Sequence, residues 1–470
     1  MRFAARWLNS LAAVVIFIVT VYRAATLSLT IDEASTYIGY VHRGWTGIFS
    51  GPFDANNHIL YSILEKFTRQ WFGMSELSLR LPVLLGAALF LWSVARLCAM
   101  LVPGLWFSLL AFLIVTANPL MLDFMAVARG YGLGLGLLAF ALLQLIEWTE
   151  DSRSWRITAA SIALGLSTAA NLMFAFASIA MFSTAVLFLV WRQRYALIPA
   201  AILPAIVIPV ALWWMPFQNY NAAAFYFGTA TVYDSLESVE LSLFVHDITR
   251  GDPFGNWFTM FYLRWWILPV LVPIVCLWTL VWIRRRATQG LALVAIVFTT
   301  TCFGMWLAHT WLGVLYPRER TGLSFVFLFL LTWTAAIGHW WKDHRLTRYF
   351  LAFPSLLLAL LFLAQFAGQF DPRYLGAWRV NWKMNDVMSQ LRQSGAHGKV
   401  RTHWIYQSSA EYYRLRWKLP LEPIVREADK FDLNNADYFL LALETDEAVA
   451  ATGMRVLYRD SVTGTTLLKK

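Results

Sequence analysis

The sequence predicts an α-helical polytopic membrane protein with about eleven transmembrane helices, interfacial amphipathic helices and a small extracytoplasmic α/β domain at its C-terminal end. Of its 470 residues, 59% are hydrophobic and only 14% are charged, whereas soluble domains carry about 25% charged residues. Apolar runs of roughly the twenty residues that cross a bilayer alternate with polar loops. The 24 tryptophans are typical of the aromatic belts at membrane interfaces.

The apolar runs define the expected spans. The stretch 157–190 is too long for one span and short for two, and Asn171 is its expected break. An alternative interpretation treats residues 1–29 as a cleaved signal peptide, which leaves the remaining topology unchanged. With two spans in 157–190, the transmembrane helices fall at about 11–29, 81–101, 104–122, 131–147, 157–172, 173–190, 196–216, 265–283, 290–309, 322–341 and 349–367.

The charges of the loops predict the orientation of the chain. Every second loop is basic, and short cytoplasmic loops of membrane proteins are enriched in Lys and Arg. The N-terminus is therefore expected in the cytoplasm and residues 370–470 outside, and the short basic loops favour a bacterial inner membrane. Because these loops account for the net charge of +10, nucleic-acid binding is excluded. The basic residues are Arg2, Arg6, Arg96, Arg153, Arg156, Arg192, Arg194, Arg284, Arg285, Arg286, Lys342, Arg345 and Arg348.

The long polar segments all lie on the opposite, outer side. Loop 30–80 contains a predicted amphipathic helix at about 57–71, and loop 217–264 contains another at about 234–247. Each places its apolar residues on one face, as helices do that lie in the plane of the interface. Arg80 is interpreted as an interfacial arginine at the start of the second span.

Two domains are expected from this organisation. Residues 1–369 form the membrane domain, and residues 370–470 form the soluble α/β domain. Hydrophobic periodicity in the second domain predicts a helix at 382–393, a strand at 399–405, a helix at 408–416, a strand at 437–443, and a final hairpin around Thr463-Gly464.

Several kinds of site are excluded by the sequence. The three cysteines fall inside apolar stretches far apart in the chain, so no disulfide framework is expected. The sequence contains no Gly-rich phosphate loop, serine triad, haem motif or HExxH motif. No cofactor and no metal are assigned, although a divalent cation stays open as an alternative through the outer residues His246, Asp247, His309 and Glu319.

The acidic pair Asp32-Glu33 begins the first outer loop. One interpretation is helix capping, in which Thr30 or Asp32 caps a helix over 33–43 and places acid at its positive end. The other is catalysis by a general base, or by an acid and a base, where an acceptor hydroxyl from the aqueous side meets a lipid-borne substrate. The residues alone leave both interpretations open.

Three arginines on the outer side run against the positive-inside bias, and such exceptions indicate a partner. Arg129 lies just before Tyr131 at the start of the fourth span, and Arg318 and Arg320 lie at the outer end of the tenth. A guanidinium group binds phosphate in bidentate fashion, so an anionic headgroup would fit them. The alternative for Arg129 is a snorkelling arginine beside a tyrosine of the interfacial belt.

The order of these motifs resembles the GT-C superfamily of polytopic glycosyltransferases, in particular the branch of protein O-mannosyltransferases and bacterial lipid A aminoarabinose transferases. The resemblance covers most of the membrane part and is densest over 25–135. The chain lacks the prolines that usually follow the histidine of the family, and Glu319 replaces the usual tyrosine. The matching segments are Asp32-Glu33, Asn57-His58-Ile59-Leu60-Tyr61, Gly73-Met74-Ser75-Glu76, Leu79-Arg80-Leu81-Pro82, Ala128-Arg129-Gly130-Tyr131 and Pro317-Arg318-Glu319.

The resemblance implies a polyprenyl-phosphate-linked sugar donor and inverting transfer to a hydroxyl of a glycolipid, polysaccharide or protein at the periplasmic face. It implies that Asp32 is the base and that Glu33 positions the acceptor or orients Asp32. Arg129, with Arg318 or Arg320, would neutralise the departing lipid phosphate. The residues expected to bind the acceptor or the sugar are Asn57, His58, Tyr61 and Tyr131.

A lipid or glycan transporter or flippase is the main alternative. Transporters usually place ionisable residues at the bilayer midplane in broken helices, often within inverted repeats. Here the spans are almost free of charge and the polar residues gather in outer loops. A non-enzymatic scaffold would leave Asp32 and the outer arginines as anchors. The sequence favours the transferase.

Overall fold

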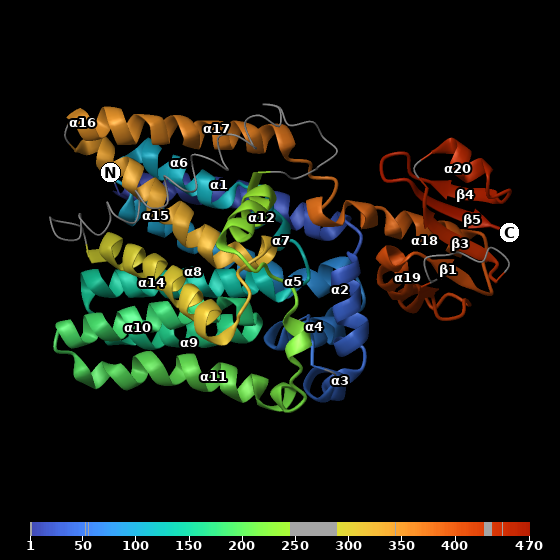
Figure 1. Ribbon diagram of the computed structural model, residues 1–470, viewed down its shortest axis with the longest axis horizontal. Helices are drawn as coiled ribbons and strands as arrows, with labels where there is room; N and C mark the ends of the chain where they lie inside the picture. The colour runs from blue at the N-terminus through green and yellow to red at the C-terminus, as the bar shows by residue number, and fades with distance from the viewer. Residues whose placement is uncertain are drawn as a thin grey trace. The chain divides into compact units, whose positions relative to one another are not determined.

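The computed structural model describes residues 2–51, 53–54, 56–244, 289–343, 345–426, 435–443 and 445–470. Figure 1 shows a mainly helical chain with a small sheet near its C-terminal end. The chain divides into two compact units. The first contains Met1–Val21, Pro52–Tyr61 and Pro82–Asp371, and the second contains Tyr22–Gly51, Ser62–Leu81 and Pro372–Lys470.

Among the described residues, eight helices are long and apolar enough to cross a membrane, so the chain is an integral membrane protein. Two further predicted spans overlap the shorter helices α6 (Leu105–Thr116) and α9 (Ser154–Ala170). The predicted span at 265–283 lies outside the described residues, and the total of eleven stays a prediction. The eight long helices overlap predicted spans and include α1 (Arg2–Thr26), α5 (Glu76–Leu101), α8 (Gly130–Asp151), α10 (Ala175–Trp191), α11 (Ile198–Gln218), α14 (Gln289–Leu312), α15 (Leu323–Lys342) and α17 (Phe353–Gln369).

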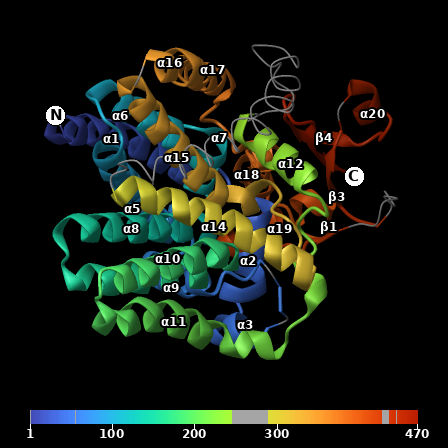
Figure 2. The same ribbon diagram turned by 60° about the vertical axis from the view of Figure 1, so that its left-hand side comes forward.

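Helices α8 to α11 pack side by side in the first unit, and both ribbon views show them in succession (Figures 1 and 2). Small residues allow the closest approaches, because a Cβ at Gly136 of α8 would lie 2.2 Å from the carbonyl oxygen of Gly86 in α5. Asn171 separates α9 from α10, as predicted. Its side chain accepts a hydrogen bond from Met173 N at 3.0 Å and caps the short turn η2 (Leu172–Phe174).

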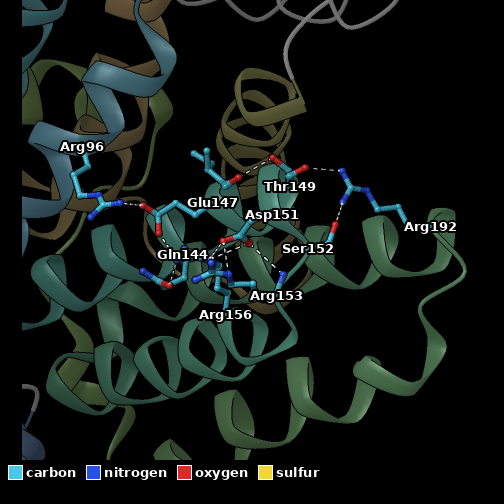
Figure 3. Close-up of polar contacts among 10 residues, drawn as sticks. Arg96, Gln144, Glu147, Thr149, Asp151, Ser152, Arg153, Arg156 and Arg192 are labelled. Carbon is cyan, nitrogen blue, oxygen red and sulfur yellow. Dashed lines mark hydrogen bonds and ion pairs between the residues drawn. The ribbon is translucent and has the colours of Figure 1, made fainter. Parts of the chain in front are cut away.

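Ion pairs join α5, α8 and α9 on the side that the sequence predicts to be cytoplasmic (Figure 3). The Glu147 carboxylate pairs with both Arg96 and Arg156, and Arg156 Nε also lies 2.9 Å from Asp151 Oδ2. Arg192, at the end of α10, donates to a main-chain carbonyl of α8 at 3.0 Å. These contacts hold the ends of four helices of the first unit to one another.

The second unit contains a five-stranded sheet with the order β2-β1-β3-β5-β4. Strands β1, β2 and β3 are parallel, and β3, β5 and β4 form antiparallel pairs. The predicted helices, strands and final hairpin of this region are confirmed, and η8, β2 and α20 are additional. The elements are η8 (Gly376–Asn381), α18 (Met384–Gln393), β1 (Val400–Thr402), α19 (Trp404–Trp417), β2 (Val425–Arg426), β3 (Tyr438–Ala442), α20 (Asp446–Ala450), β4 (Arg455–Arg459) and β5 (Thr465–Lys469).

The helices predicted in the two long polar loops are also present. The helix predicted at 57–71 is α4, whose Trp71 is 71% exposed, as expected for a helix in an interface. The helix predicted at 234–247 is α12, and residues 245–247 lie outside the described part. The remaining elements are α2 (Ile31–Thr36), η1 (Tyr37–Val41), α3 (Gly44–Ser50), α4 (Ile59–Phe72), α7 (Pro119–Phe124), η3 (Tyr195–Leu197), η4 (Ala222–Phe225), α12 (Val232–Phe244), η6 (Glu319–Gly322), α16 (Arg345–Thr347) and η7 (Arg348–Ala352).

Candidate functional site

The acidic pair lies in the first turn of α2, in the second unit. Thr30 is the N-cap, and its hydroxyl accepts a hydrogen bond from Glu33 N at 3.2 Å. The Glu33 carboxylate returns the contact by accepting from Thr30 N at 2.8 Å, which completes a capping box. Capping therefore uses Thr30 and Glu33. The Asp32 side chain is not part of this box and belongs to a partly exposed residue.

Glu33 also forms a buried ion pair with Arg80. Two parallel bonds of 2.8 Å join the guanidinium group to the two carboxylate oxygens, and both side chains are fully buried. Arg80 further donates to the carbonyl oxygens of Ala24, Leu27 and Ser28. The Glu33 carboxylate is thus the partner that makes a buried guanidinium group stable. The position of Arg80 at the membrane interface stays a prediction.

A second buried contact lies beside this ion pair. The Tyr413 hydroxyl, in α19, donates to Glu76 Oε1 at 2.9 Å and accepts from Leu29 N at 3.1 Å. Arg416 NH1 lies 2.6 Å from the other carboxylate oxygen of Glu76. Burial raises the pKa of Tyr413 well above its usual value, and the Glu76 charge adds to the rise. The phenol therefore stays protonated and keeps donating.

Asp32 is the residue of this region whose position suits proton transfer. It is only partly exposed, it lies at the positive end of a helix, and the neighbouring Glu33 is neutralised by Arg80. A carboxylate in such a position can accept a proton from a hydroxyl within hydrogen-bonding reach. Glu33, in contrast, is occupied by Arg80 and by the N-cap of α2, so its role is to hold the start of that helix.

The first unit gathers several of the other predicted residues around Arg129. Arg129 Nη2 donates to Asn56 Oδ1 at 2.8 Å, and its guanidinium group lies 5.7 Å from the ring centre of Tyr131. The His58 and Tyr131 rings meet edge to face at 5.1 Å. Gly130 is required between them, because a Cβ there would lie 1.9 Å from Ala170 O and 2.9 Å from His58 Cβ. Arg129, His58 and Tyr131 are buried, and Asn56 is half-buried.

Burial and two arginines disfavour the charged form of His58. Burial lowers its pKa well below the usual value, and the charges of Arg129 and Arg320 lower it further. The two arginines therefore lie within electrostatic reach of one imidazole ring. Among the described residues, no group bonds to His58 Nε2, which leaves this nitrogen available to a ligand.

Arg318 and Arg320 lie in a turn that α12 holds in place. Ser235 Oγ donates to Pro317 O at 2.5 Å, and Glu319 N donates to Ser238 Oγ at 3.1 Å. Glu319 has a φ of +47°, and its carboxylate lies 3.5 Å from Arg318 and 3.7 Å from Arg320. The turn thus presents two guanidinium groups, of which Arg318 is 50% exposed and Arg320 is 19% exposed.

The remaining predicted residues lie in the first unit as well. Asn57 and Tyr61 are both buried on either side of the start of α4. No group of three or more His, Cys, Asp or Glu side chains that could hold a metal ion occurs in the part of the chain that the structure describes. His246 and Asp247, from the alternative divalent-cation site, lie outside that part.

The structure thus places the sequence-predicted residues in two groups, one in each unit. The acidic pair belongs to the second unit, and Arg129, Arg318, Arg320, Asn57, His58, Tyr61 and Tyr131 belong to the first. Sequence reasoning missed the roles of Arg80, Glu76, Tyr413 and Arg416. These four residues lie 43 or more positions beyond Glu33, and long-range side-chain pairs leave no local periodic signal. The available sign in the sequence was an arginine at the start of an apolar run, where a charge needs a partner.

Comparisons with known proteins give a match at the level of structure. A scan of protein-family models and a search of curated proteins find no match. ArnT from Cupriavidus metallidurans bound to undecaprenyl phosphate is similar with a TM-score of 0.52 and 11% identity, over 98% of this chain and 97% of ArnT. The apo form of ArnT gives a TM-score of 0.51 and 13% identity, over 98% and 97%.

A third similar structure is the oligosaccharyltransferase of Archaeoglobus fulgidus tethered with an acceptor peptide. It has 13% identity and a TM-score of 0.44, over 95% of this chain and 68% of that one. The two ArnT structures, which match nearly the whole chain, are the ones that show its fold. The chain has the fold of ArnT along nearly its whole length, and the resemblance predicted from its motifs is confirmed at the level of the fold.

Proposed function

We propose that this protein is an integral membrane glycosyltransferase that moves a sugar from a polyprenyl-phosphate-linked donor to an acceptor hydroxyl. The observation that carries the proposal is the buried Arg129, whose guanidinium group bonds to Asn56 and lies 5.7 Å from the ring centre of the buried Tyr131. A buried cation among apolar helices favours an anionic ligand, and a lipid phosphate is an anion that enters from the bilayer. The shared fold supports the same class of donor, because ArnT holds undecaprenyl phosphate.

Asp32 acts as the general base of the transfer. Its carboxylate takes the proton of the acceptor hydroxyl while that oxygen attacks the anomeric carbon of the donor. The bond from the anomeric carbon to the phosphate oxygen breaks on the opposite face, so the configuration at that carbon inverts. Glu33 orients Asp32, since both carboxylate oxygens of Glu33 already hold Arg80 and the cap of α2.

Arg129, with Arg318 or Arg320, stabilises the lipid phosphate as it leaves. Fixed positive groups that face a developing negative charge lower the barrier, and they act strongly where water is excluded. Asn57, His58, Tyr61 and Tyr131 bind the sugar or the acceptor through neutral hydrogen bonds and aromatic contacts. No cofactor is assigned.

The reaction takes place at the periplasmic face of a bacterial inner membrane, with the N-terminus in the cytoplasm and residues 370–470 in the periplasm. The acceptor is a glycolipid, a cell-surface polysaccharide or a protein. The basic loops support this orientation, because basic residues are enriched on the cytoplasmic side of membrane proteins. Figure 3 shows four of these basic residues close together, namely Arg96, Arg153, Arg156 and Arg192.

The test is a transfer assay with purified protein in liposomes. A panel of undecaprenyl-phosphate-linked sugars, radiolabelled in the sugar, is added one at a time with a membrane extract as the source of acceptor. We expect labelled acceptor with the wild-type protein and none with Asp32→Asn. The control is Asp234→Asn, which changes an exposed acid of α12 and should keep full transfer. Full transfer by a folded Asp32→Asn protein would refute Asp32 as the base.

Arg129 is tested separately through its donor dependence. Arg129→Ala should raise the donor KM and lower kcat, because the phosphate loses a ligand in both the ground state and the transition state. The control is Arg153→Ala, which removes an exposed arginine at the start of α9. An unchanged donor dependence in Arg129→Ala would remove the phosphate role from this residue.

A further inference from the structure

The segment that carries Asp32 is held by residues from the C-terminal part of the chain, within the second unit. Leu29 N donates to the Tyr413 hydroxyl at 3.1 Å, and Ile31 N donates to Asn381 Oδ1 at 3.1 Å. The Ser28 hydroxyl donates to a main-chain carbonyl at Trp382 and accepts from a main-chain N–H at residue 385, each at 3.0 Å. The loop residue in each of these contacts lies within four positions of Asp32 in the sequence.

The same short segment is held from the other side by Arg80, which binds the carbonyl oxygens of Leu27 and Ser28. Arg80 thus binds carbonyl groups while Tyr413 and Asn381 bind N–H groups. The backbone that leads into Asp32 has few remaining ways to move, because its polar groups are paired on both sides. The position of the Asp32 carboxylate follows from this pairing.

Tyr413 occupies the central place in these contacts. Its hydroxyl is the only atom in the described contacts that joins the loop backbone to the Glu76 carboxylate, through 3.1 Å and 2.9 Å bonds. Arg416 lies 2.6 Å from the same carboxylate and fixes it. Tyr413 is fully buried, and burial keeps its pKa well above the usual value, so it is a permanent donor.

We propose that Tyr413 is a positioning residue of the transfer reaction, through which the C-terminal domain sets the geometry of the loop that carries Asp32. This inference rests on the proposed function, since it takes Asp32 as the base. Tyr413 itself contacts the backbone three residues before Asp32 and a carboxylate of α5. The soluble domain is then a part of the catalytic apparatus in addition to any role in acceptor access.

The test compares two tyrosine-to-phenylalanine variants in one helix. Tyr406 is also in α19, is also fully buried, and bonds through its hydroxyl to Thr465 Oγ1 at 3.0 Å, on the sheet. Tyr413→Phe and Tyr406→Phe therefore remove the same atom from equally buried sites. Only the first removes a contact with the Asp32 loop, so Tyr406→Phe is the matched control for loss of stability.

Tyr413→Phe should lower kcat about tenfold to a hundredfold at an unchanged donor KM, since a displacement of about 1 Å of a reacting group has an effect of this order. Tyr406→Phe should keep kcat within about twofold. The two variants should unfold at similar temperatures. Ser28→Ala removes a neighbouring support of the loop, and it should also lower kcat at an unchanged KM.

The outcomes separate this inference from the proposed function. A Tyr413→Phe protein with the kcat of Tyr406→Phe, beside an inactive Asp32→Asn protein, overturns the positioning role and leaves the proposed function standing. An active Asp32→Asn protein overturns the proposed function itself. If Tyr413→Phe does not fold, Ser28→Ala decides: a wild-type kcat in that variant overturns the inference.

Discussion

The Glu33–Arg80 ion pair gives the sharpest prediction about stability. Glu33→Gln keeps the capping box, because Gln at this position also accepts from the N-cap N–H, but it removes the charge that neutralises Arg80. Both side chains are fully buried, and their two bonds are 2.8 Å long. Removing one member of such a pair leaves the other charge buried without compensation, which destabilises a protein by about 3–5 kcal/mol.

The expected loss is larger than for an exposed pair. Arg2 and Glu150 form such a pair at 3.1 Å, with side chains 56% and 45% exposed. Exposed pairs contribute about 0–1 kcal/mol, so Glu150→Gln is the matched control. The assay is equilibrium unfolding of both variants in the same detergent and lipid mixture. A Glu33→Gln protein within about 1 kcal/mol of wild type would refute the buried-pair reasoning.

Three further predictions follow from the described contacts. Burial and two arginines hold the His58 pKa low, so the unfolded chain binds more protons than the native one below about pH 6.5. The free energy of unfolding should therefore decrease as the pH is lowered below that value, by up to about 1.4 kcal/mol per pH unit for one proton. This slope should shrink in His58→Asn, and an equal slope would contradict the prediction. Gly130→Ala should destabilise by about 1–3 kcal/mol through overpacking, whereas Gly304→Ala, where an added Cβ has nothing within 4 Å, should be neutral; equal melting curves would contradict it. Glu147→Gln should destabilise less than Glu33→Gln, because Arg96 is 32% exposed and water can solvate it; the reverse order in unfolding measurements would contradict this.

Local patterns in the sequence were enough to predict most of the helices and strands. The apolar runs give the described spans because crossing a bilayer requires about twenty residues, and Asn171 ends α9 by capping the next turn. The capping box at Thr30 is likewise local: the cap and its partner are three residues apart. Signals of this kind are read within a single turn or a single helix.

The parts of the site that escaped prediction depend on contacts over long sequence distances. Arg80 lies 47 positions after Glu33, and Tyr413 lies 337 positions after Glu76 and 384 positions after Leu29. A partner of this kind is chosen by tertiary packing, and one sequence shows no trace of it. The sequence also could not show which of the two adjacent acids caps the helix. The structure shows that Glu33 completes the capping box and that Asp32 is not part of it.

The most direct test of glycosyl transfer is the fate of the lipid carrier. Wild-type protein in liposomes receives an undecaprenyl-phosphate-linked sugar with label in both the sugar and the lipid, together with acceptor extract. The account predicts that free undecaprenyl phosphate appears in equal amount to the sugar found on the acceptor, and that Asp32→Asn releases none. Movement of the intact lipid-linked sugar across the bilayer without release of the carrier would contradict it.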